Sequence, residues 1–340
     1  MKQSNYIKIS SEKYNGSDLS YFQENIRKPD ELDLEIAAEI LDFQEKIGSI
    51  DMGGAWKYYN ENTRANYVKS LRQNDLNTLA SLLSNMFQTE CTSAIITPSI
   101  NISKDHDLIS QMSWDLDACA EFTRGKYPLE VLDTENIGAP FGTIRNNVKI
   151  LPDSPRHLYF ADLIMSKIKD PSMNILEIGG GYGGLISFLR KVNYSGTYYN
   201  IDLPETLFVC YYYLRRNSIR VNLIKELSDF KKGEVNLIPS MFYNKLTKEL
   251  KFDLFFNSAS LAEMSQEVCF NYIEMINRST AKYIIHCNSN FLAFPDSKIH
   301  IEVLAKDFPW DPNFELITHY VSPFQGASGR YRVYIYDRVS

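Results

Sequence analysis

The sequence predicts an α/β protein in which a seven-stranded, mostly parallel sheet carries helices on both faces and ends in an antiparallel hairpin, after a mainly helical N-terminal region. Three observations predict this fold. From about residue 157, short apolar runs alternate with segments of helical spacing, which is typical of parallel sheets. No helix separates the last two strand-like runs, so they should pair as a hairpin at one edge. Before residue 150, apolar side chains recur at helical spacing in three segments.

Those three helical segments span residues 31–50, 61–90 and 105–125. Residues 1–30 are polar and mixed, and we expect a loosely held lead-in. Residues 133–156 are rich in Gly, Pro and Asn and predict an extended linker. We therefore divide the chain into residues 1–150, a cap that shapes the substrate site or is purely structural, and residues 151–340, which carry the sheet.

The second region is expected to begin with a helix over "HLYFADLIMSKIK" and a buried strand over "MNILEIG". Proline opens the helix that starts at residue 204, where its missing N–H costs nothing. The remaining elements follow in the order helix "YGGLISFLRKV", strand "GTYYNID", helix "PETLFVCYYYLRRN", strands "RVNLI" and "EVNLIPS", strand "KFDLFFN", helix "SQEVCFNYIEMINRS", strand "AKYIIHCNS", and the hairpin strands "FELITHYVS" and "GRYRVYIYDRV".

Composition narrows the class of protein. The net charge is −6 and no block of lysine and arginine exceeds two residues, so we expect no nucleic-acid partner. The five cysteines are scattered and include no C-x-x-C pair, which favours free thiols in a reducing compartment. No signal peptide and no apolar run of about 18 residues is visible, so we expect a cytoplasmic protein without a transmembrane segment. The oligomeric state is left open.

The densest glycine cluster follows the first strand of the second region, in "NILEIGGGYGGLISFLRK". In a doubly wound sheet, ligands bind beyond the carboxyl ends of the strands, where a strand turns into its helix. A side chain on Gly179 or Gly181 is expected to occupy the space of a cofactor. The N–H groups at the start of the next helix suit a carboxylate or a phosphate.

Two carboxylates near this turn indicate which cofactor binds. Gly179-x-Gly181-x-x-Gly184 satisfies the dinucleotide fingerprint, which is weak alone. Glu177, however, would repel a pyrophosphate and suits an α-ammonium group. Asp202 ends the second strand, 25 residues later, where it can accept both ribose hydroxyls. Together they favour S-adenosyl-L-methionine (SAM) over NAD.

The E-x-G-x-G-x-G run followed by "NIDLPE" resembles a class I SAM-dependent methyltransferase of Rossmann-like fold, over residues 157–340. "ILEIGGGYGGL", "IDLPET", "LIPSMF" and "FDLFFNSASLAEMSQEV" resemble the bacterial putative sugar O-methyltransferases, which act in building surface polysaccharides. "VNLI" occurs twice, at 221–224 and 235–238, and the sequence does not tell which copy ends at the adenine. The resemblance implies a cofactor site formed by Glu177, Gly179, Gly180, Gly181, Tyr182, Asp202, Leu203, Ser240, Met241 and Asn257.

Methyl transfer to a sugar hydroxyl needs a base, which helps by roughly 10²–10⁴-fold. Glu263, in the small-residue loop after the fourth strand, is the first candidate, and capping of the next helix is its alternative. His157 is the second candidate, or a packed histidine at a helix start. Arg156 and Asn288 are expected to contact the substrate, although Arg156 could instead pair with the cofactor's carboxylate. No clustered metal-ligand motif is visible, so we expect no metal.

The sequence thus predicts a SAM-dependent O-methyltransferase acting on a sugar of a nucleotide-linked or lipid-linked glycan precursor. Three alternatives stay open: a methyltransferase with another small-molecule acceptor, an NAD-dependent oxidoreductase, and a non-catalytic protein that keeps the fold. The sequence does not tell which sugar or which hydroxyl reacts, or whether the acceptor is a monomer or a polymer.

Overall fold

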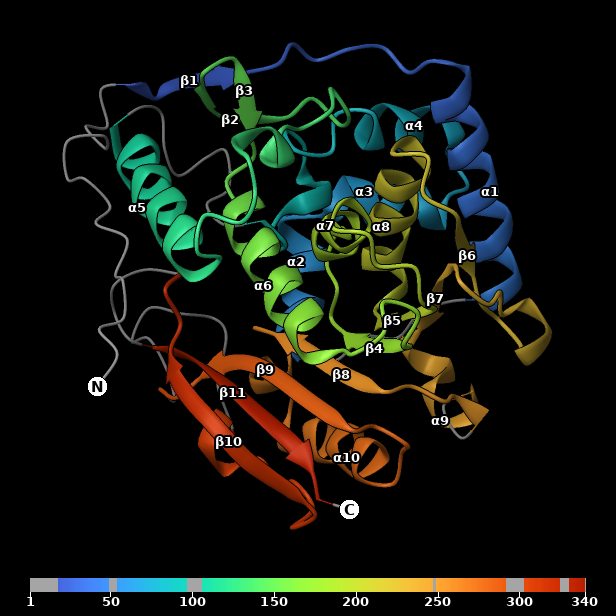
Figure 1. Ribbon diagram of the computed structural model, residues 1–340. Helices are drawn as coiled ribbons and strands as arrows, with labels where there is room; N and C mark the ends of the chain where they lie inside the picture. Colours follow the sequence, from blue (N-terminus) through green and yellow to red (C-terminus); the bar gives the residue numbers. More distant parts are fainter. Residues whose placement is uncertain are drawn as a thin grey trace.

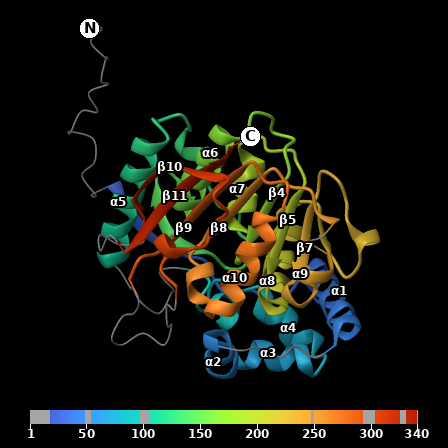
Figure 2. The ribbon, with the colours of Figure 1, turned by 90° about the horizontal axis from the view of Figure 1, so that it is seen from below.

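The computed structural model describes residues 18–48, 54–96, 106–246, 249–291, 303–324 and 330–339 (Figure 1). Its main feature is an eight-stranded sheet in the order β10-β11-β9-β8-β4-β5-β7-β6. Figure 2 shows these strands side by side from β10 to β7. The strands are β4 (Ile175–Ile178), β5 (Tyr198–Asp202), β6 (Val221–Leu223), β7 (Val235–Pro239), β8 (Leu254–Ser258), β9 (Tyr283–Ser289), β10 (Phe314–Val321) and β11 (Tyr331–Arg338).

The pairing confirms the predicted α/β class. The strands from β6 to β9 pair in parallel, whereas β11 runs antiparallel to both β9 and β10. The expected strand number of seven was one too low. Both "VNLI" runs form strands, and the shorter one, β6, lies at the edge beside β7. The copy that ends next to β5 is therefore β7.

The strand order reverses at β4, which pairs with β5 on one side and with β8 on the other. Side chains along β4 alternate between the two faces: Ile175 packs in one hydrophobic cluster, and Leu176 and Ile178 pack in the other. A reversal of this kind opens a crevice at the carboxyl ends of the central strands. The candidate site lies at this edge.

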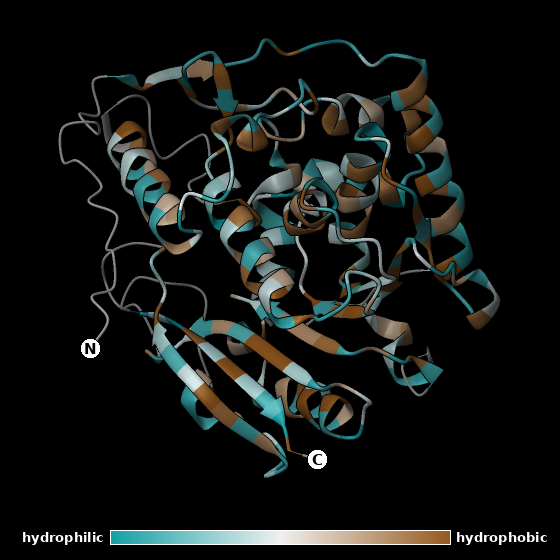
Figure 3. Ribbon diagram, viewed as in Figure 1, coloured by the Kyte–Doolittle hydropathy of each residue, from teal (hydrophilic) through white to brown (hydrophobic). Residues whose placement is uncertain are grey.

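Helices cover both faces of the sheet, and their hydrophobic stripes alternate with hydrophilic ones (Figure 3). One cluster of buried side chains joins the sheet to helices α6 to α8, and the other joins it to α10. The helices of this region are α6 (Ser154–Lys167), α7 (Gly184–Lys191), α8 (Pro204–Arg216), α9 (Tyr243–Leu246) and α10 (Gln266–Asn277).

The N-terminal region is mainly helical, as predicted, but it also holds a small antiparallel sheet. Its helices are α1 (Glu31–Ile47), α2 (Gly54–Asn62), α3 (Ala65–Arg72), α4 (Leu76–Leu83) and α5 (His106–Phe122). Its strands, in the order β1-β2-β3, are β1 (Ser20–Gln23), β2 (Phe141–Arg145) and β3 (Val148–Ile150). The expected linker over 133–156 is thus wrong, because it contains the β2–β3 hairpin and the start of α6.

The N-terminal region shares its core with the large sheet. A single cluster of buried side chains runs from Leu19 to Ile335. At its edge, Asp33 of α1 accepts hydrogen bonds from Tyr212 of α8 (2.7 Å) and from Arg27 (2.6 Å). The division at residue 150 stays a prediction about organisation, and in the described residues the two parts pack as one body around this core.

Candidate functional site

The glycine-rich loop joins β4 to α7 at the carboxyl edge of the sheet. Gly179, Gly181 and Gly183 have φ angles of +75°, +58° and +87°, a region that favours glycine. A Cβ at Gly179 would collide with the hydroxyl of Ser260, and one at Gly181 would lie 3.0 Å from Ile95. We expected the missing side chains to leave room for a ligand. In the structure, Ser260 fills that space at Gly179 and Ile95 borders it at Gly181, and contacts of these glycines with a cofactor stay predictions.

Glu177 lies beneath the loop. It is 3% exposed, and its Oε2 accepts a 2.8 Å hydrogen bond from the Tyr198 hydroxyl. A Cβ at Gly180 would stand 2.5 Å from the same oxygen, so Gly180 is glycine because it covers this carboxyl. Burial raises the pKa of Glu177 to about 8, and the neighbouring Asp202 adds to that rise. The predicted contact of Glu177 with an ammonium group stays a prediction.

Asp202 lies beside the same loop. Its carboxylate accepts hydrogen bonds from the N–H of Gly181 (3.1 Å) and of Leu203 (2.7 Å). Burial raises the pKa of Asp202 to about 7, and the two N–H donors oppose that rise. The structure therefore brings Asp202, the glycine loop and Glu177 together, as the spacing in the sequence predicts. Asn200, which sequence reasoning missed, accepts a 3.2 Å hydrogen bond from the N–H of Gly180.

The other expected cofactor residues lie around this centre. Leu203 precedes the first turn of α8. Ser240 and Met241 begin the short helix that follows β7. The last residue of β7, Pro239, pairs with Asp202. The Met241 side chain is exposed. Contacts of these three residues with a cofactor stay predictions.

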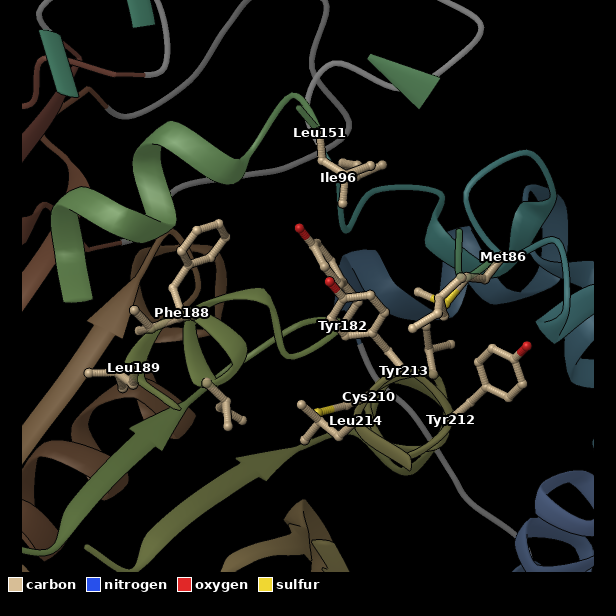
Figure 4. Close-up of a cluster of buried hydrophobic side chains, with 14 of the residues drawn as sticks. Met86, Ile96, Leu151, Tyr182, Phe188, Leu189, Cys210, Tyr212, Tyr213 and Leu214 are labelled. Atoms are coloured by element: carbon tan, nitrogen blue, oxygen red, sulfur yellow. The ribbon is translucent and has the colours of Figure 1, made fainter. Parts of the chain in front are cut away.

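The Tyr182 side chain is buried among hydrophobic neighbours, which include Met86, Ile96 and Tyr213 (Figure 4). Its ring packs at 5.1 Å from that of Tyr213 and at 5.3 Å from that of Phe87. Tyr182 therefore anchors the loop to the N-terminal region, and its place in the cofactor site stays a prediction.

Asn257 and Asn288 are fully buried at the ends of β8 and β9. The Asn288 amide donates to Asn257 Oδ1 (2.7 Å), and the Asn257 amide donates to the carbonyl of Ile178 (2.7 Å) and to Ser260 Oγ. They thus tie the loop after β8 to the end of β4. We expected both to touch a ligand. In the structure their amide groups form hydrogen bonds with other protein atoms, and a contact with a ligand stays a prediction.

The loop after β8 carries Glu263. Ala259 within it adopts φ +57°, which is strained for a residue with a Cβ. Burial raises the pKa of Glu263 to about 7, while Arg330 and a hydrogen bond with Tyr331 oppose that rise. The alternative role of Glu263, capping α10, is filled by another residue: Ser265 is the N-cap and its hydroxyl accepts from the N–H of Val268.

His157 and Arg156 lie in the first turn of α6. The His157 Nδ1 is 3.4 Å from the Tyr182 hydroxyl, and its ring packs against Phe188. Burial and the neighbouring Arg156 hold the pKa of His157 well below its usual value, so it is a weak base. Arg156 donates to Asp153 Oδ1 at 2.8 Å. Its contact with a substrate stays a prediction.

Two further charged residues near the site come from the N-terminal region, and sequence reasoning missed both. Arg64 is fully buried, and its guanidinium donates to the backbone carbonyl of Glu205 at 3.3 Å. Asp115 of α5 is buried close to Arg156, and burial raises its pKa to about 7. Neither has a local motif, because its partners lie far away in the sequence.

In the described ranges, no group of three or more His, Cys, Asp or Glu side chains is arranged to hold a metal ion. None of the helices in the same ranges is long and apolar enough to cross a membrane.

No protein-family model and no curated protein matches this chain. Solved structures do match, at low identity. They include a TehB-like SAM-dependent methyltransferase from Corynebacterium glutamicum (15% identity, 52% of this chain, 86% of that chain, TM-score 0.35) and the methyltransferase domain of bacterial CtHen1 (10%, 54%, 97%, 0.40). A third is the CcbJ methyltransferase from Streptomyces caelestis (12%, 55%, 90%, 0.36). Since these likenesses are remote, the chemistry of the site must be argued from its own residues.

Proposed function

We propose that this protein is a SAM-dependent O-methyltransferase that methylates a sugar hydroxyl. One observation carries the proposal: Glu177, the glycine loop and Asp202 are joined at the point where the strand order reverses, with Gly181 N–H bound to Asp202 and Gly180 packed over Glu177. In open α/β sheets this is where a nucleoside-containing ligand binds.

The donor and acceptor groups at this edge fit SAM. A carboxylate offers about four lone-pair positions, and Asp202 uses two of them on backbone N–H groups. The remaining positions suit the two hydroxyls of a ribose. Glu177, in turn, accepts one hydroxyl hydrogen bond on Oε2 from the described residues and lies under the loop. With a pKa of about 8 its carboxyl is mostly protonated at pH 7; an ammonium group beside it would favour the ionised form, whereas a negative pyrophosphate would oppose ionisation. This pair of acids supports SAM over NAD.

Glu263 is proposed as the base. When bound, SAM supplies an electrophilic methyl group on a sulfonium, so the protein must orient the acceptor hydroxyl and remove its proton. A carboxyl with a pKa of about 7 is half ionised at neutral pH and is suited to accept that proton. Arg330 lies near enough to stabilise the ionised form. His157 is the weaker candidate, because burial keeps its pKa low.

The acceptor is proposed to be a sugar in a nucleotide-linked or lipid-linked glycan precursor. The sequence resemblance to bacterial sugar O-methyltransferases supports this choice. Charged and hydroxyl side chains near Glu263 support it too, because Tyr331 interacts with Glu263, Arg330 and Arg156. Such groups form the hydrogen bonds that a polyhydroxy compound requires.

The test measures equilibrium binding of S-adenosylhomocysteine and of NADH by isothermal titration calorimetry. We expect S-adenosylhomocysteine to bind and NADH not to bind. Labelled SAM is then offered with a panel of nucleotide sugars, lipid-linked sugars and small phenols. Tight binding of NADH alone would make the protein an oxidoreductase, and transfer only to phenols would replace the sugar acceptor. If Asp202→Ala left the protein's biological effect intact, the protein would act without catalysis.

A further inference from the structure

A fully buried arginine links the N-terminal region to the proposed cofactor site. Arg64 precedes α3, and its guanidinium donates to the carbonyl of Glu205 (3.3 Å) and lies 5.0 Å from the centre of the Tyr67 ring. The Tyr67 hydroxyl donates to the same carbonyl at 2.7 Å. Both side chains therefore lie against the first turn of α8, directly after Asp202.

Burial of a guanidinium away from water is strongly unfavourable unless nearby negative charge compensates it. Asp202 and Glu205 both interact electrostatically with Arg64. Glu205 is 3% exposed, and its Oε2 has no hydrogen-bond partner among the residues that the structure describes. Two neighbouring acids thus face the same buried cation, which the sheet itself does not supply; the exposed Arg72 also interacts with Glu205.

We propose that Arg64 is a positioning residue of the cofactor site: it is the counter-ion of Asp202 and Glu205, and it keeps the Asp202 carboxylate charged so that it can accept ribose hydroxyls. This inference rests on the proposed function, since it assumes that Asp202 binds SAM. It also gives the N-terminal region a defined role, because the cofactor site is incomplete without residue 64.

The balance of groups around Asp202 supports this role. The N–H donors of Leu203 and Gly181 and the charge of Arg64 favour the ionised form of Asp202, while burial and Glu205 oppose it. The titratable or charged groups that interact with Asp202 from the elements packed around it include Arg64 before α3, Glu177 of β4, Glu205 and Cys210 of α8, and Tyr272 of α10. Among these groups in the described chain, Arg64 is the one cation.

The consequence is a pH-dependent affinity. With a pKa of about 7, Asp202 is about half ionised at pH 7. If loss of Arg64 raises that pKa by about one unit, the ionised fraction at pH 7 falls to roughly a tenth, a loss of about fivefold. At pH 9 the carboxylate is almost fully ionised in either case, so the loss should shrink to less than about twofold.

The experiment compares Arg64→Gln, which keeps a hydrogen-bonding group without the charge, with Arg64→Lys, which keeps the charge. Lys69→Met is the matched control, because Lys69 is an exposed cation on α3, the helix that Arg64 precedes. Binding of S-adenosylhomocysteine to the full chain is measured by calorimetry from pH 6 to 9, and folding is checked by circular dichroism. We expect Arg64→Gln to weaken binding about fivefold at pH 7 and by less than about twofold at pH 9. Arg64→Lys and Lys69→Met should stay within about twofold of the parent throughout.

A second arm repeats Arg64→Gln in an Asp202→Asn background, where the substitution should no longer change affinity. The inference is overturned if Arg64→Gln binds like the parent at pH 7, or if it weakens binding equally at every pH and in both backgrounds. If Arg64→Gln does not fold, the same measurements are made on Arg64→Lys in both backgrounds. The inference is also overturned if Arg64→Lys folds but loses affinity equally at all pH values. If the parent itself does not bind S-adenosylhomocysteine, the proposed function fails instead.

Discussion

Replacing Glu177 with glutamine should stabilise the ligand-free protein, although Glu177 belongs to the proposed cofactor site. The carboxyl is 3% exposed and has a pKa of about 8 in the folded chain, against the ordinary value of 4.5. Between these two values the folded protein holds a proton that the unfolded chain has lost. Folding stability therefore falls as pH rises from 4.5 to 8. Glutamine does not titrate and escapes this loss.

The magnitude follows from the linkage slope of about 1.36 kcal/mol per pH unit. Over the interval from 4.5 to 8 the loss amounts to about 5 kcal/mol. The glutamine amide can still accept the hydrogen bond from Tyr198, but it adds a buried N–H donor that costs about 1–3 kcal/mol when unpaired. We therefore expect Glu177→Gln to be about 2–4 kcal/mol more stable than the parent at pH 8, and no more stable at pH 4.5.

Urea unfolding at pH 5, 6, 7 and 8, without ligand, measures this difference. Glu263 also has a raised pKa, but it titrates in both proteins and cancels in the comparison. Asp202 interacts with Glu177, so loss of the Glu177 charge should lower the raised pKa of Asp202 and add to the stabilisation in the same direction. Tyr198→Phe is the control, since it removes the hydrogen bond that favours the charged form: the pKa of Glu177 should rise further, and the loss of stability should continue to higher pH at the same slope. A stability difference that does not grow with pH would refute the reasoning.

Three further predictions concern the same edge of the sheet. Gly180→Ala should cost about 1–3 kcal/mol in urea unfolding, because its Cβ would stand 2.5 Å from Glu177; Gly48→Ala, in open space at φ +79°, should cost only about 1 kcal/mol. Asn257→Ala should lower the free energy of unfolding by about 2–3 kcal/mol, because the buried partners of its amide lose their hydrogen bonds. A decrease of less than about 0.5 kcal/mol would contradict the importance of this network. Glu263→Gln should lower kcat about 10²–10⁴-fold and leave S-adenosylhomocysteine affinity unchanged; an unaltered pH–rate profile near pH 7 would exclude Glu263 as the base.

Local patterns predicted most of the fold, and the misses have physical reasons. The alternation of apolar runs was enough for the parallel sheet and the terminal hairpin. The β2–β3 hairpin was missed although "IRNNVKI" contains its signal: Asn146 and Asn147 have φ of +50° and +65°, which fits a two-residue turn with left-handed residues. Its partner strand β1 lies more than a hundred residues earlier, and no local pattern in the sequence reports such a pairing.

In the candidate site, too, local sequence patterns predict some residues and miss others. Glu177, the glycines and Asp202 were found together because a strand–turn–helix unit brings its own ends together over a short stretch of chain. Arg64 and Asn200 were missed for different reasons. Asn200 was passed over inside a strand, where its hydrogen bond to the loop has no sequence signature. Arg64 reaches Glu205 across 141 positions, and only packing of the N-terminal region brings them together.

The buried carboxyl groups of this protein differ in how many hydrogen bonds and positive charges the fold provides for them. That difference supports the proposed location of the site. Asp33, which ties α1 to α8, accepts hydrogen bonds from Arg27, Tyr212 and the N–H of Asp30. Glu177 and Asp202 are also withdrawn from water, yet they receive neutral donors and burial raises their pKa values. A raised pKa in a buried carboxyl group lowers folding stability at neutral pH. It therefore has no benefit for a carboxyl group whose role is only structural. The raised pKa values of the acids at the carboxyl ends of β4 and β5 therefore fit the proposed ligand, whose ammonium and hydroxyl groups would bind these carboxyls.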